Sequence, residues 1–441
     1  MQDKLRRIAG EITQGAIRAV DPFVLIKEQI EKKQNVLYCK GVEPVDLAAY
    51  ERVFVCGAGK GTAPMARAME ELLGDYLRGG DIIVKYGHTD RLRKVQLHEA
   101  AHPVPDENTL SATNRLLENL QHLTENDCVF VLLTGGGSAL MESLPAGIQL
   151  TDLQQLSAVL LECGANIHEI NCIRKHVSRI KGGQLAREIH PARCVTLALS
   201  DVIGDDLSVI ASGPTTADPS TFGDALTILD KYRIADKIPA LIRAHLQKGR
   251  EGKIAETPKK NDEIFQSVSN TVIGNNRLAL ERAAIIAEAS NFNTMILTSM
   301  LEGEAREIAK VFAAIIRELQ MTNKPLKKPA CILAGGEPTV QIRGQGKGGR
   351  NQELALAVAL SGISQPYVFV SCGSDGTDGP TDAAGAICDQ NTLGRAEKQN
   401  LKAAARLADN DAYHFFSPLN DLIMTGPTGT NVMDIIFALI P

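Results

Sequence analysis

From residue 50 onward the sequence repeats one pattern: a short run of β-branched and aliphatic residues, a glycine-rich turn, and a stretch with helical periodicity. In the first block this pattern predicts strands at 52–56, 128–134 and 194–200, and helices at 62–73 and near 138–141. Alternating strands and helices are typical of a mainly parallel sheet covered by helices on both faces. The sequence therefore predicts an α/β fold.

A second block of the same kind follows a charged segment with Gly and Pro. We expect this segment, 246–262, to link a domain at 1–245 to a smaller domain at 263–441, with 425–441 able to pack back on the first. Two such blocks usually face each other across a cleft, and ligands bind beyond the carboxyl ends of their strands. The helical and strand patterns outside the first block fall at 5–20, 22–33, 277–289, 302–320 and 351–360 for helices, and at 271–273, 294–298, 330–334, 339–343 and 367–371 for strands.

The composition argues against several classes of protein. With 47 basic and 52 acidic residues the net charge is −5, and without a long basic run nothing predicts a nucleic-acid partner. No apolar run approaches the roughly 20 residues of a membrane helix. The nine cysteines include no C-x-x-C pair and lie mostly in apolar runs, so we expect buried thiols in a cytoplasmic protein and no zinc site.

Two glycine-rich loops end predicted strands of the first block. Gly57 and Gly59 allow an anion to approach the backbone, and Lys60 adds a positive charge beside them. A tight turn with a solvated lysine, or a helix cap, is the simpler alternative for such loops. After strand 128–134 come four residues whose N–H groups can form an anion nest: Gly135, Gly136, Gly137 and Ser138.

Charged residues follow in two further motifs of the first block. Arg174, Lys175 and Lys181 gather near glycines before a predicted helix. A solvated helix face is the usual fate of such a run, but cations beside glycines favour a polyanion site, with Lys181 as a phosphate contact. Asp201 comes directly after a buried strand. It can accept a proton from a substrate hydroxyl or hold Mg²⁺, unless it only caps a turn.

The second block contains a cationic glycine loop at 344–349, where three glycines match G-x-G-x-x-G. Taken alone this spacing predicts a dinucleotide site. However, the loop carries Lys347 and ends at Arg350, which suits a phosphate or a carboxylate held in bidentate fashion. Asn351 and Glu353 can orient that guanidinium, and Asn351 is a candidate substrate contact.

Aspartates occupy another predicted strand end of the second block, with Asp375 as a second candidate for Mg²⁺ beside Asp201. The stretch 425–431 offers hydroxyls and glycines before what reads as an apolar helix. Together the motifs supply anion-binding loops, cations on both blocks, and aspartates at strand ends. Phosphoryl transfer needs these parts, because its catalysis is mostly positioning and charge neutralisation.

Seven stretches, in order along nearly the whole chain, resemble glycerate 2-kinases of the MOFRL type. The resemblance implies a Rossmann-like N-terminal domain, a C-terminal MOFRL domain and an active site between them. It also implies phosphorylation of D-glycerate at its 2-hydroxyl by ATP and Mg²⁺, with Lys60 and Arg350 as the active-site lysine and arginine. The stretches are GAGKG at 57–61, LLTGGGSAL at 132–140, NCIRKHVSRIKGGQLA at 171–186, LSDVIGDDLSVIASGPT at 199–215, GKGGRNQE at 346–353, GTDGPTDAAGA at 376–386 and TGPTGTNVMD at 425–434.

Two other functions stay open at this stage. The glycine fingerprint at 344–349 motivates an NAD(P)H-dependent hydroxypyruvate reductase, a label that members of the family have carried. A non-catalytic sensor of phosphorylated metabolites would keep the cationic loops without needing the aspartates. The sequence is compatible with a monomer and with a homodimer.

Overall fold

The computed structural model describes residues 2–441, and the chain divides into two compact units. One is Pro22–Ile273, the parallel-sheet unit; the other, the mixed-sheet unit, joins the residues up to Asp21 to Gly274–Pro441. The expected linker at 246–262 lies inside the parallel-sheet unit, and helix α1 (Gln2–Arg18) belongs to the other unit. Residues 246–250 of this segment end helix α10 (Ala240–Arg250), and only packing decides which unit a segment joins.

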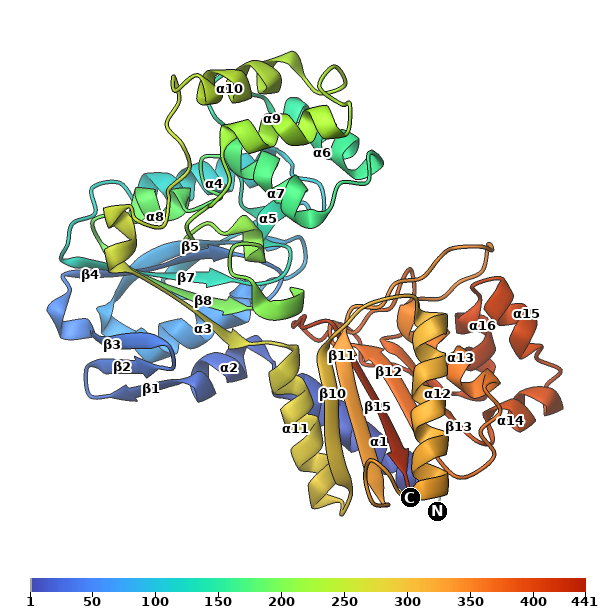
Figure 1. The fold of residues 1–441 in the computed structure, drawn as a ribbon. Coiled ribbons are helices and arrows are strands. Elements are labelled where there is room, and N and C mark those ends of the chain that lie inside the picture. Colours follow the sequence, from blue (N-terminus) through green and yellow to red (C-terminus); the bar gives the residue numbers. More distant parts are fainter. Residues whose placement is uncertain (1) are drawn as a thin grey trace. The chain divides into compact units, whose positions relative to one another are not determined.

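The parallel-sheet unit is built on six strands in the order β6-β5-β4-β7-β8-β9 (Figure 1). The pairs from β6 to β8 are parallel, as the alternating pattern predicted. The strand predicted at 271–273 is part of β9 and lies in this sheet, not in the second block. The strands are β4 (Arg52–Ala58), β5 (Leu77–Lys85), β6 (Val95–Ala100), β7 (Asp127–Leu133), β8 (Arg193–Leu199) and β9 (Val268–Gly274).

Helices cover both faces of this sheet, with α3 on one side and α4 and α8 on the other (Figure 1). Four further helices, α6, α7, α9 and α10, pack around a separate apolar core that includes Leu153, Ile173 and Phe222. The motif 171–176 lies within α7 rather than before a helix, because Asn166 caps that helix five residues earlier. The helices are α2 (Pro22–Gln29), α3 (Thr62–Leu73), α4 (Glu107–Asn119), α5 (Gly137–Leu140), α6 (Leu150–Glu162), α7 (Ile167–His176), α8 (Gln184–Ile189), α9 (Phe222–Lys231) and α10 (Ala240–Arg250).

A small antiparallel sheet of β1 (Ile30–Lys33), β2 (Val36–Cys39) and β3 (Val42–Asp46) follows α2. The helix predicted to run through residue 33 therefore ends at Gln29. Charged residues at 31–33 fit a helical face by pattern alone, whereas here they lie on an exposed strand. Cross-strand pairing has overridden the local helical periodicity.

The mixed-sheet unit has the strand order β10-β11-β15-β12-β13-β14, in which only β10 and β11 pair in parallel (Figure 1). The last strand, β15 (Asp434–Ile440), is central and completely buried. The apolar helix predicted after 425–431 is therefore a strand of the mixed sheet. A run of seven apolar or buried residues is the length of a strand that pairs on both sides. The others are β10 (Asn293–Leu301), β11 (Ala330–Gly336), β12 (Val368–Gly373), β13 (Gly385–Asp389) and β14 (Leu422–Ile423).

Helices α1 and α11 lie on one face of the mixed sheet and α12 and α13 on the other (Figure 1). The strand predicted at 339–343 does not form; Thr339 makes one isolated bridge to Glu304, and the following residues are an exposed loop. Besides α1, the helices are α11 (Asn276–Ala289), α12 (Ala305–Thr322), α13 (Arg350–Leu360), α14 (Thr392–Lys398), α15 (Ala403–Ala408) and α16 (Ala412–Phe416).

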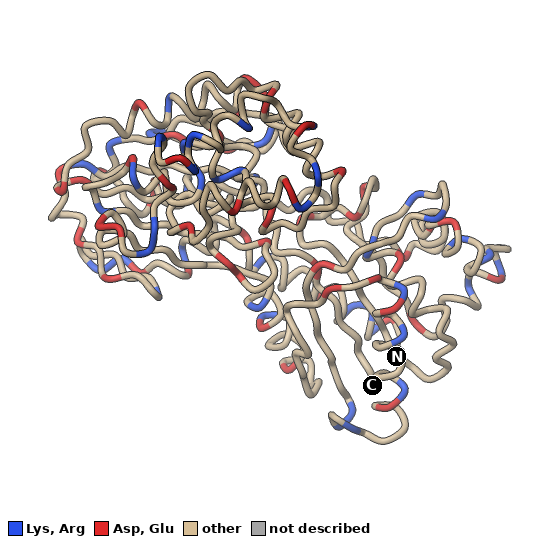
Figure 2. Tube along the Cα trace, turned by 45° about the horizontal axis from the view of Figure 1, so that its top comes forward, with Lys and Arg blue, Asp and Glu red and all other residues tan. Residues whose placement is uncertain are grey.

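Charge and cysteine placement match an ordinary globular chain. Figure 2 shows basic and acidic residues interspersed along both units. All nine cysteines are free thiols and seven of them are buried, as expected. Over residues 2–441, we find no helix that combines the length and apolarity required to cross a membrane.

Candidate functional site

The carboxyl ends of β4, β7 and β8 lie side by side in the parallel-sheet unit. Ala58, the last residue of β4, pairs with Leu133 of β7, and Leu133 pairs with Ala198 of β8. The structure therefore brings together, at one sheet edge, three features predicted from sequence. These are the loop at 57–61, the triple-glycine loop at 135–138, and Asp201.

The first two of these loops interlock through their backbones. The Lys60 N–H donates to the Gly135 carbonyl (2.9 Å), and the Gly61 N–H donates to the Thr134 hydroxyl (2.9 Å). Gly59 has a φ of +146°, and a Cβ there would lie 2.1 Å from Thr134 Oγ1. Glycine is needed here for the close approach of the two loops, so it does more than provide a flexible turn.

Lys60 reaches this edge as an uncompensated cation. Its side chain is half-buried, and among residues 2–441 its ammonium forms no hydrogen bond or ion pair. Its backbone is held by the interlocked loops, while its charge is left for a ligand. This is the arrangement that an anion-binding lysine requires.

Ser138 is less suited to donate to a phosphate than its sequence position suggests. Ser212 donates its single hydroxyl proton to Asn171 Oδ1 (2.8 Å), so the 2.7 Å contact between Ser138 and Ser212 must use the Ser138 proton. The Ser138 hydroxyl therefore offers only acceptor lone pairs to the site.

The backbone beside this contact is strained. Ala211 and Ser212 both have positive φ, at +50° and +61°, a conformation that clusters at functional sites.

Lys181, predicted from sequence as a phosphate contact, is paired inside the parallel-sheet unit. Its side chain is fully buried, and its ammonium donates to Glu142 (2.7 Å) and to the Met141 carbonyl (3.0 Å). Burial lowers the pKa of Lys181 to about 8, although Glu142 opposes that shift. Lys181 therefore stabilises the segment that follows α5, and its charge is neutralised by Glu142 in the interior of the protein.

His102 is a titratable side chain at this edge that the sequence patterns did not single out. A Cβ on Gly136 would lie 3.1 Å from His102 Nε2 and 3.5 Å from Lys60 Cγ, so all three meet at the triple-glycine loop. Burial and the charge of Lys60 lower the pKa of His102 to about 4. The imidazole is therefore neutral at pH 7. The only sequence signal for a role of His102 in the site is its position just after strand β6.

Arg350, in the mixed-sheet unit, is anchored by two carboxylates. Its Nε and Nη2 donate to the buried Asp434 at 2.6 and 3.0 Å, and its Nη1 donates to Glu337 at 3.0 Å. Burial opposes the charge, but Asp434 outweighs it and the pKa of Arg350 is raised. A guanidinium has five N–H donors, so two remain for a ligand. Asp434 lies in the motif at 425–434, but local sequence pattern gives no sign of its pairing with Arg350.

Asn351, predicted from sequence as a substrate contact, is buried and already paired within the mixed-sheet unit. Its side-chain oxygen accepts from Ser371 (2.6 Å), and its amide and backbone N–H donate to Asp378 (3.3 and 3.0 Å). Asp378 also accepts from Gln352, so it caps the start of α13. Asn351 thus holds the helix that carries Arg350.

The G-x-G-x-x-G loop is closed by the protein's own side chains. Backbone N–H groups of residues 343–345 and 347 donate to side-chain oxygens of Asp409, Asn410 and Asp411, at 2.7 to 3.0 Å. A Cβ on Gly346 would lie 2.4 Å from Asp411 Cβ, so the glycine serves this packing. These N–H groups are therefore already occupied and are not free for a dinucleotide pyrophosphate.

The two metal candidates lie on different units, Asp201 in the parallel-sheet unit and Asp375 in the mixed-sheet unit. Oδ1 of Asp375 accepts from the backbone and hydroxyl of Thr377, both at 3.0 Å. A Cβ on Gly373 would lie 3.4 Å from Asp375 Oδ1 and 3.6 Å from Asp434 Oδ1, so two carboxylates converge beside this glycine. Within residues 2–441, no three or more His, Cys, Asp or Glu side chains gather as a metal cluster.

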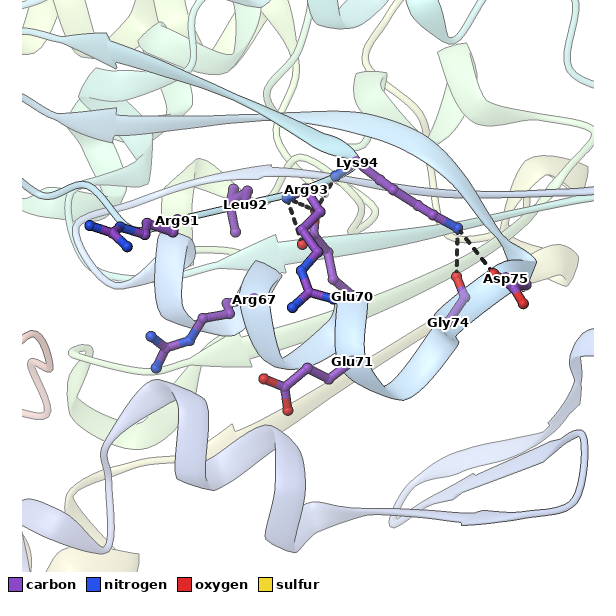
Figure 3. Close-up of a pocket in the computed structure, with 9 residues that line it drawn as sticks. All are labelled: Arg67, Glu70, Glu71, Gly74, Asp75, Arg91, Leu92, Arg93 and Lys94. Atoms are coloured by element: carbon purple, nitrogen blue, oxygen red, sulfur yellow. Dashed lines mark hydrogen bonds and ion pairs between the residues drawn. The ribbon is translucent and has the colours of Figure 1, made fainter.

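A pocket of about 560 Å³ lies elsewhere on the parallel-sheet unit (Figure 3). It is formed by the second half of α3 and the segment 91–94, whereas Lys60 precedes the start of α3. Glu70 accepts from the backbone N–H groups of three residues there, and Lys94 donates to the Gly74 carbonyl (2.9 Å). These contacts fasten the segment to α3, away from the sheet edge that holds the glycine loops.

Fold and site together define a two-unit α/β protein that presents cations for phosphate or carboxylate anions. Residues 330–434 match the MOFRL family, and residues 8–247 match a domain described as a domain of unknown function (DUF4147). The chain is 42% identical over 441 residues to D-glycerate 2-kinase of Thermotoga maritima, with 99% of each chain covered. It belongs to the glycerate 2-kinase family.

Further comparisons agree with this assignment. The crystal structure of glycerate kinase from Thermotoga maritima superposes with a TM-score of 0.90 at 40% identity, covering 100% of both chains. A relative from Agrobacterium vitis, 38% identical over 98% of this chain and 93% of its own, is named a putative hydroxypyruvate reductase. The expected α/β fold with a C-terminal MOFRL domain is confirmed.

Proposed function

We propose that the protein transfers the γ-phosphoryl group of ATP to the 2-hydroxyl of D-glycerate, giving 2-phosphoglycerate and ADP. The observation that carries the proposal is the uncompensated ammonium of Lys60, held against a loop whose glycines place no side chains over it. A transferring phosphoryl group carries negative charge that such a cation stabilises. The glycerate 2-kinase family supplies the acceptor.

In the proposed reaction the 2-hydroxyl oxygen forms a bond to the γ-phosphorus while the bond to the bridging oxygen of ADP breaks. Lys60 neutralises charge on the migrating group, and the two remaining donors of Arg350 hold the glycerate carboxylate or the same group. Asp201 accepts the hydroxyl proton or contacts Mg²⁺. The triple-glycine loop receives ATP phosphates through its backbone.

Mg²⁺ is part of the proposal because Mg²⁺ bound to ATP phosphates neutralises part of their charge. Asp375 fits this role, since its Oδ2 has no partner among residues 2–441 and a second carboxylate, Asp434, lies nearby. Mn²⁺ binding followed by electron paramagnetic resonance tests it without turnover. We expect Asp375→Asn to weaken Mn²⁺ binding in the presence of ATP; unchanged binding would exclude Asp375.

The decisive experiment is NMR of the product formed from D-glycerate and ATP. We expect 2-phosphoglycerate, identified by coupling of phosphorus to the proton on C2. 3-Phosphoglycerate would contradict the position of transfer, and nucleotide binding without transfer to any hydroxy acid tested would favour a sensor. The free thiols suit a reducing compartment, so we also propose a cytoplasmic location.

Hydroxypyruvate reduction is the rival function, because a relative bears that name. Its sequence motivation was the glycine fingerprint, whose donors the residues 409–411 already occupy. Mixing the protein with NADH or NADPH and hydroxypyruvate separates the two functions. We expect no loss of reduced-cofactor absorbance; steady oxidation would overturn the kinase proposal in favour of the reductase.

A further inference from the structure

The guanidinium of Arg174 lies on the triple-glycine loop without a counter-ion. Arg174 is on α7, three residues after Asn171, so both side chains share the helix face that meets this loop. Its Nη2 donates to the Ser138 carbonyl at 3.0 Å. Across residues 2–441 no carboxylate forms an ion pair with it, and its buried Nε has no acceptor.

Arg174 differs in this respect from the other cations of the same motif. Lys175 is buried and contacts Asp218 (3.3 Å), and Lys181 is buried against Glu142 (2.7 Å). Arg179 is exposed, with Glu188 4.0 Å away. Of the four, only the half-buried Arg174 combines contact with the triple-glycine loop and the lack of a carboxylate partner.

An unpaired, largely desolvated guanidinium is unfavourable unless something completes its hydrogen bonds. Burial lowers the pKa of Arg174, and the charge of Glu142 only partly offsets this. Glu142 cannot serve as the missing partner, because its carboxylate already binds Lys181 and Ser178. The free donors of Arg174 are therefore available to a ligand.

The neighbouring charge indicates what kind of ligand. Lys60, from the 57–61 loop, also packs against the triple-glycine loop, and its ammonium too lacks a carboxylate partner among residues 2–441. A phosphate group, with a charge near −2, matches two cations better than a carboxylate does. Ser138 directs its proton to Ser212, so the loop needs another side-chain donor.

We propose that Arg174 binds phosphate oxygens at the triple-glycine loop, either those of the nucleotide or that of phosphorylated glycerate. This inference rests on the proposed function, from which the two phosphate sources come. It replaces Lys181, the cation predicted from sequence for this role, by a residue seven positions earlier.

The test is calorimetric binding of ADP, 2-phosphoglycerate and D-glycerate to three variants. We expect Arg174→Gln to weaken the binding of one of the two phosphate ligands about 10- to 100-fold and to leave the binding of D-glycerate unchanged. Arg174→Lys keeps the positive charge but loses the paired N–H donors of the guanidinium, so it should weaken the binding of the same ligand less. The matched control, Arg179→Gln on the exposed arginine, should bind all three ligands as the wild type does.

The outcomes are separable. Phosphate-ligand affinities within twofold of wild type in both Arg174 variants, or a loss confined to D-glycerate, would overturn the inference. Should Arg174→Gln fail to fold, judged by its thermal transition, Arg174→Lys carries the test. Because binding is read without turnover, a wild-type protein that binds ADP but makes no 2-phosphoglycerate would defeat the proposed function while leaving Arg174 testable.

Discussion

The glycine-rich loops of the two units look alike in sequence and differ in structure. At 57–61 and 135–138 the glycines let two loops interlock through their backbones and leave Lys60 uncompensated. At 343–349 the glycines let the loop pack on 409–411, whose side chains accept its N–H groups. A glycine loop after a strand is an anion site only when the protein leaves its donors open.

The two predicted active-site cations show the same contrast. The Lys60 ammonium has no partner among residues 2–441, whereas the Arg350 guanidinium is part of a network with Asp434 and Glu337. The Lys60 charge therefore serves only to bind a negatively charged ligand. The Arg350 charge serves to bind such a ligand and also stabilises the mixed-sheet unit, because its partner Asp434 is buried.

The largest effect that would sharpen this contrast is on catalysis. We expect Lys60→Ala to lower kcat by about 10³ or more, since it removes a charge needed in the transition state. The free energy of unfolding should hardly change, because the ammonium has no partner to lose. Steady-state kinetics and urea unfolding measure the two quantities, with Lys248→Ala on an exposed lysine as the control. Near-normal turnover would remove Lys60 from the mechanism.

Arg350→Ala should lower both kcat and the free energy of unfolding. The fall in kcat should be about 10² or more, and the free energy of unfolding should drop by roughly 2–4 kcal/mol because buried Asp434 loses its partner. Arg343→Ala, on an exposed arginine of the same loop, is the control. An Arg350→Ala protein as stable as the wild type would refute the contrast with Lys60.

The 343–349 loop can be tested through Asn410. Its Oδ1 accepts from the backbone of Arg343 and Gly344, and its Nδ2 donates to Glu353 (2.8 Å). We expect Asn410→Ala to lower the free energy of unfolding by about 2 kcal/mol, with kcat changed less than tenfold. Asn420→Ala is matched, because both residues have a left-handed backbone (φ +54° and +55°) but Asn420 is exposed. Equal losses in both variants would assign the effect to the backbone.

Much of the fold could be predicted because it follows from local periodicity. The strands predicted at 52–56, 128–134 and 194–200 form within a residue or two of those bounds, as β4, β7 and β8. Lys60 and the triple-glycine loop were placed correctly at strand ends, since parallel strands end at the same edge. Features set by the order of residues along one element were therefore accessible.

The rest depends on partners that are distant in sequence. Lys181 and Asn351 are of types that bind ligands, but Glu142, 39 residues away, and Asp378, 27 residues away, occupy them first. The central position of β15 likewise follows from pairing with β11 and β12. Residue type shows what a side chain can bind, whereas the fold decides what reaches it.

The smallest predicted effect uses His102 to report whether anions bind at the Lys60 edge. Burial and the charge of Lys60 hold its pKa at about 4. Phosphates bound beside Lys60 would offset that charge, so saturating ADP should raise the pKa of His102 by about one unit, which corresponds to about 1.4 kcal/mol. NMR titration measures the shift, with the exposed His190 as the control.

The sign of the pH dependence follows from the same pKa. Because the folded protein binds the His102 proton less readily than the unfolded chain, stability falls as pH is lowered from about 6.5 to about 4. His102→Gln should remove about 1–2 kcal/mol of that fall, after allowance for partial exposure. ADP favours the protonated imidazole, so its affinity should rise as pH falls toward 5. A His102 pKa that ADP leaves unchanged at saturation would show that nucleotide phosphates do not bind at the triple-glycine loop.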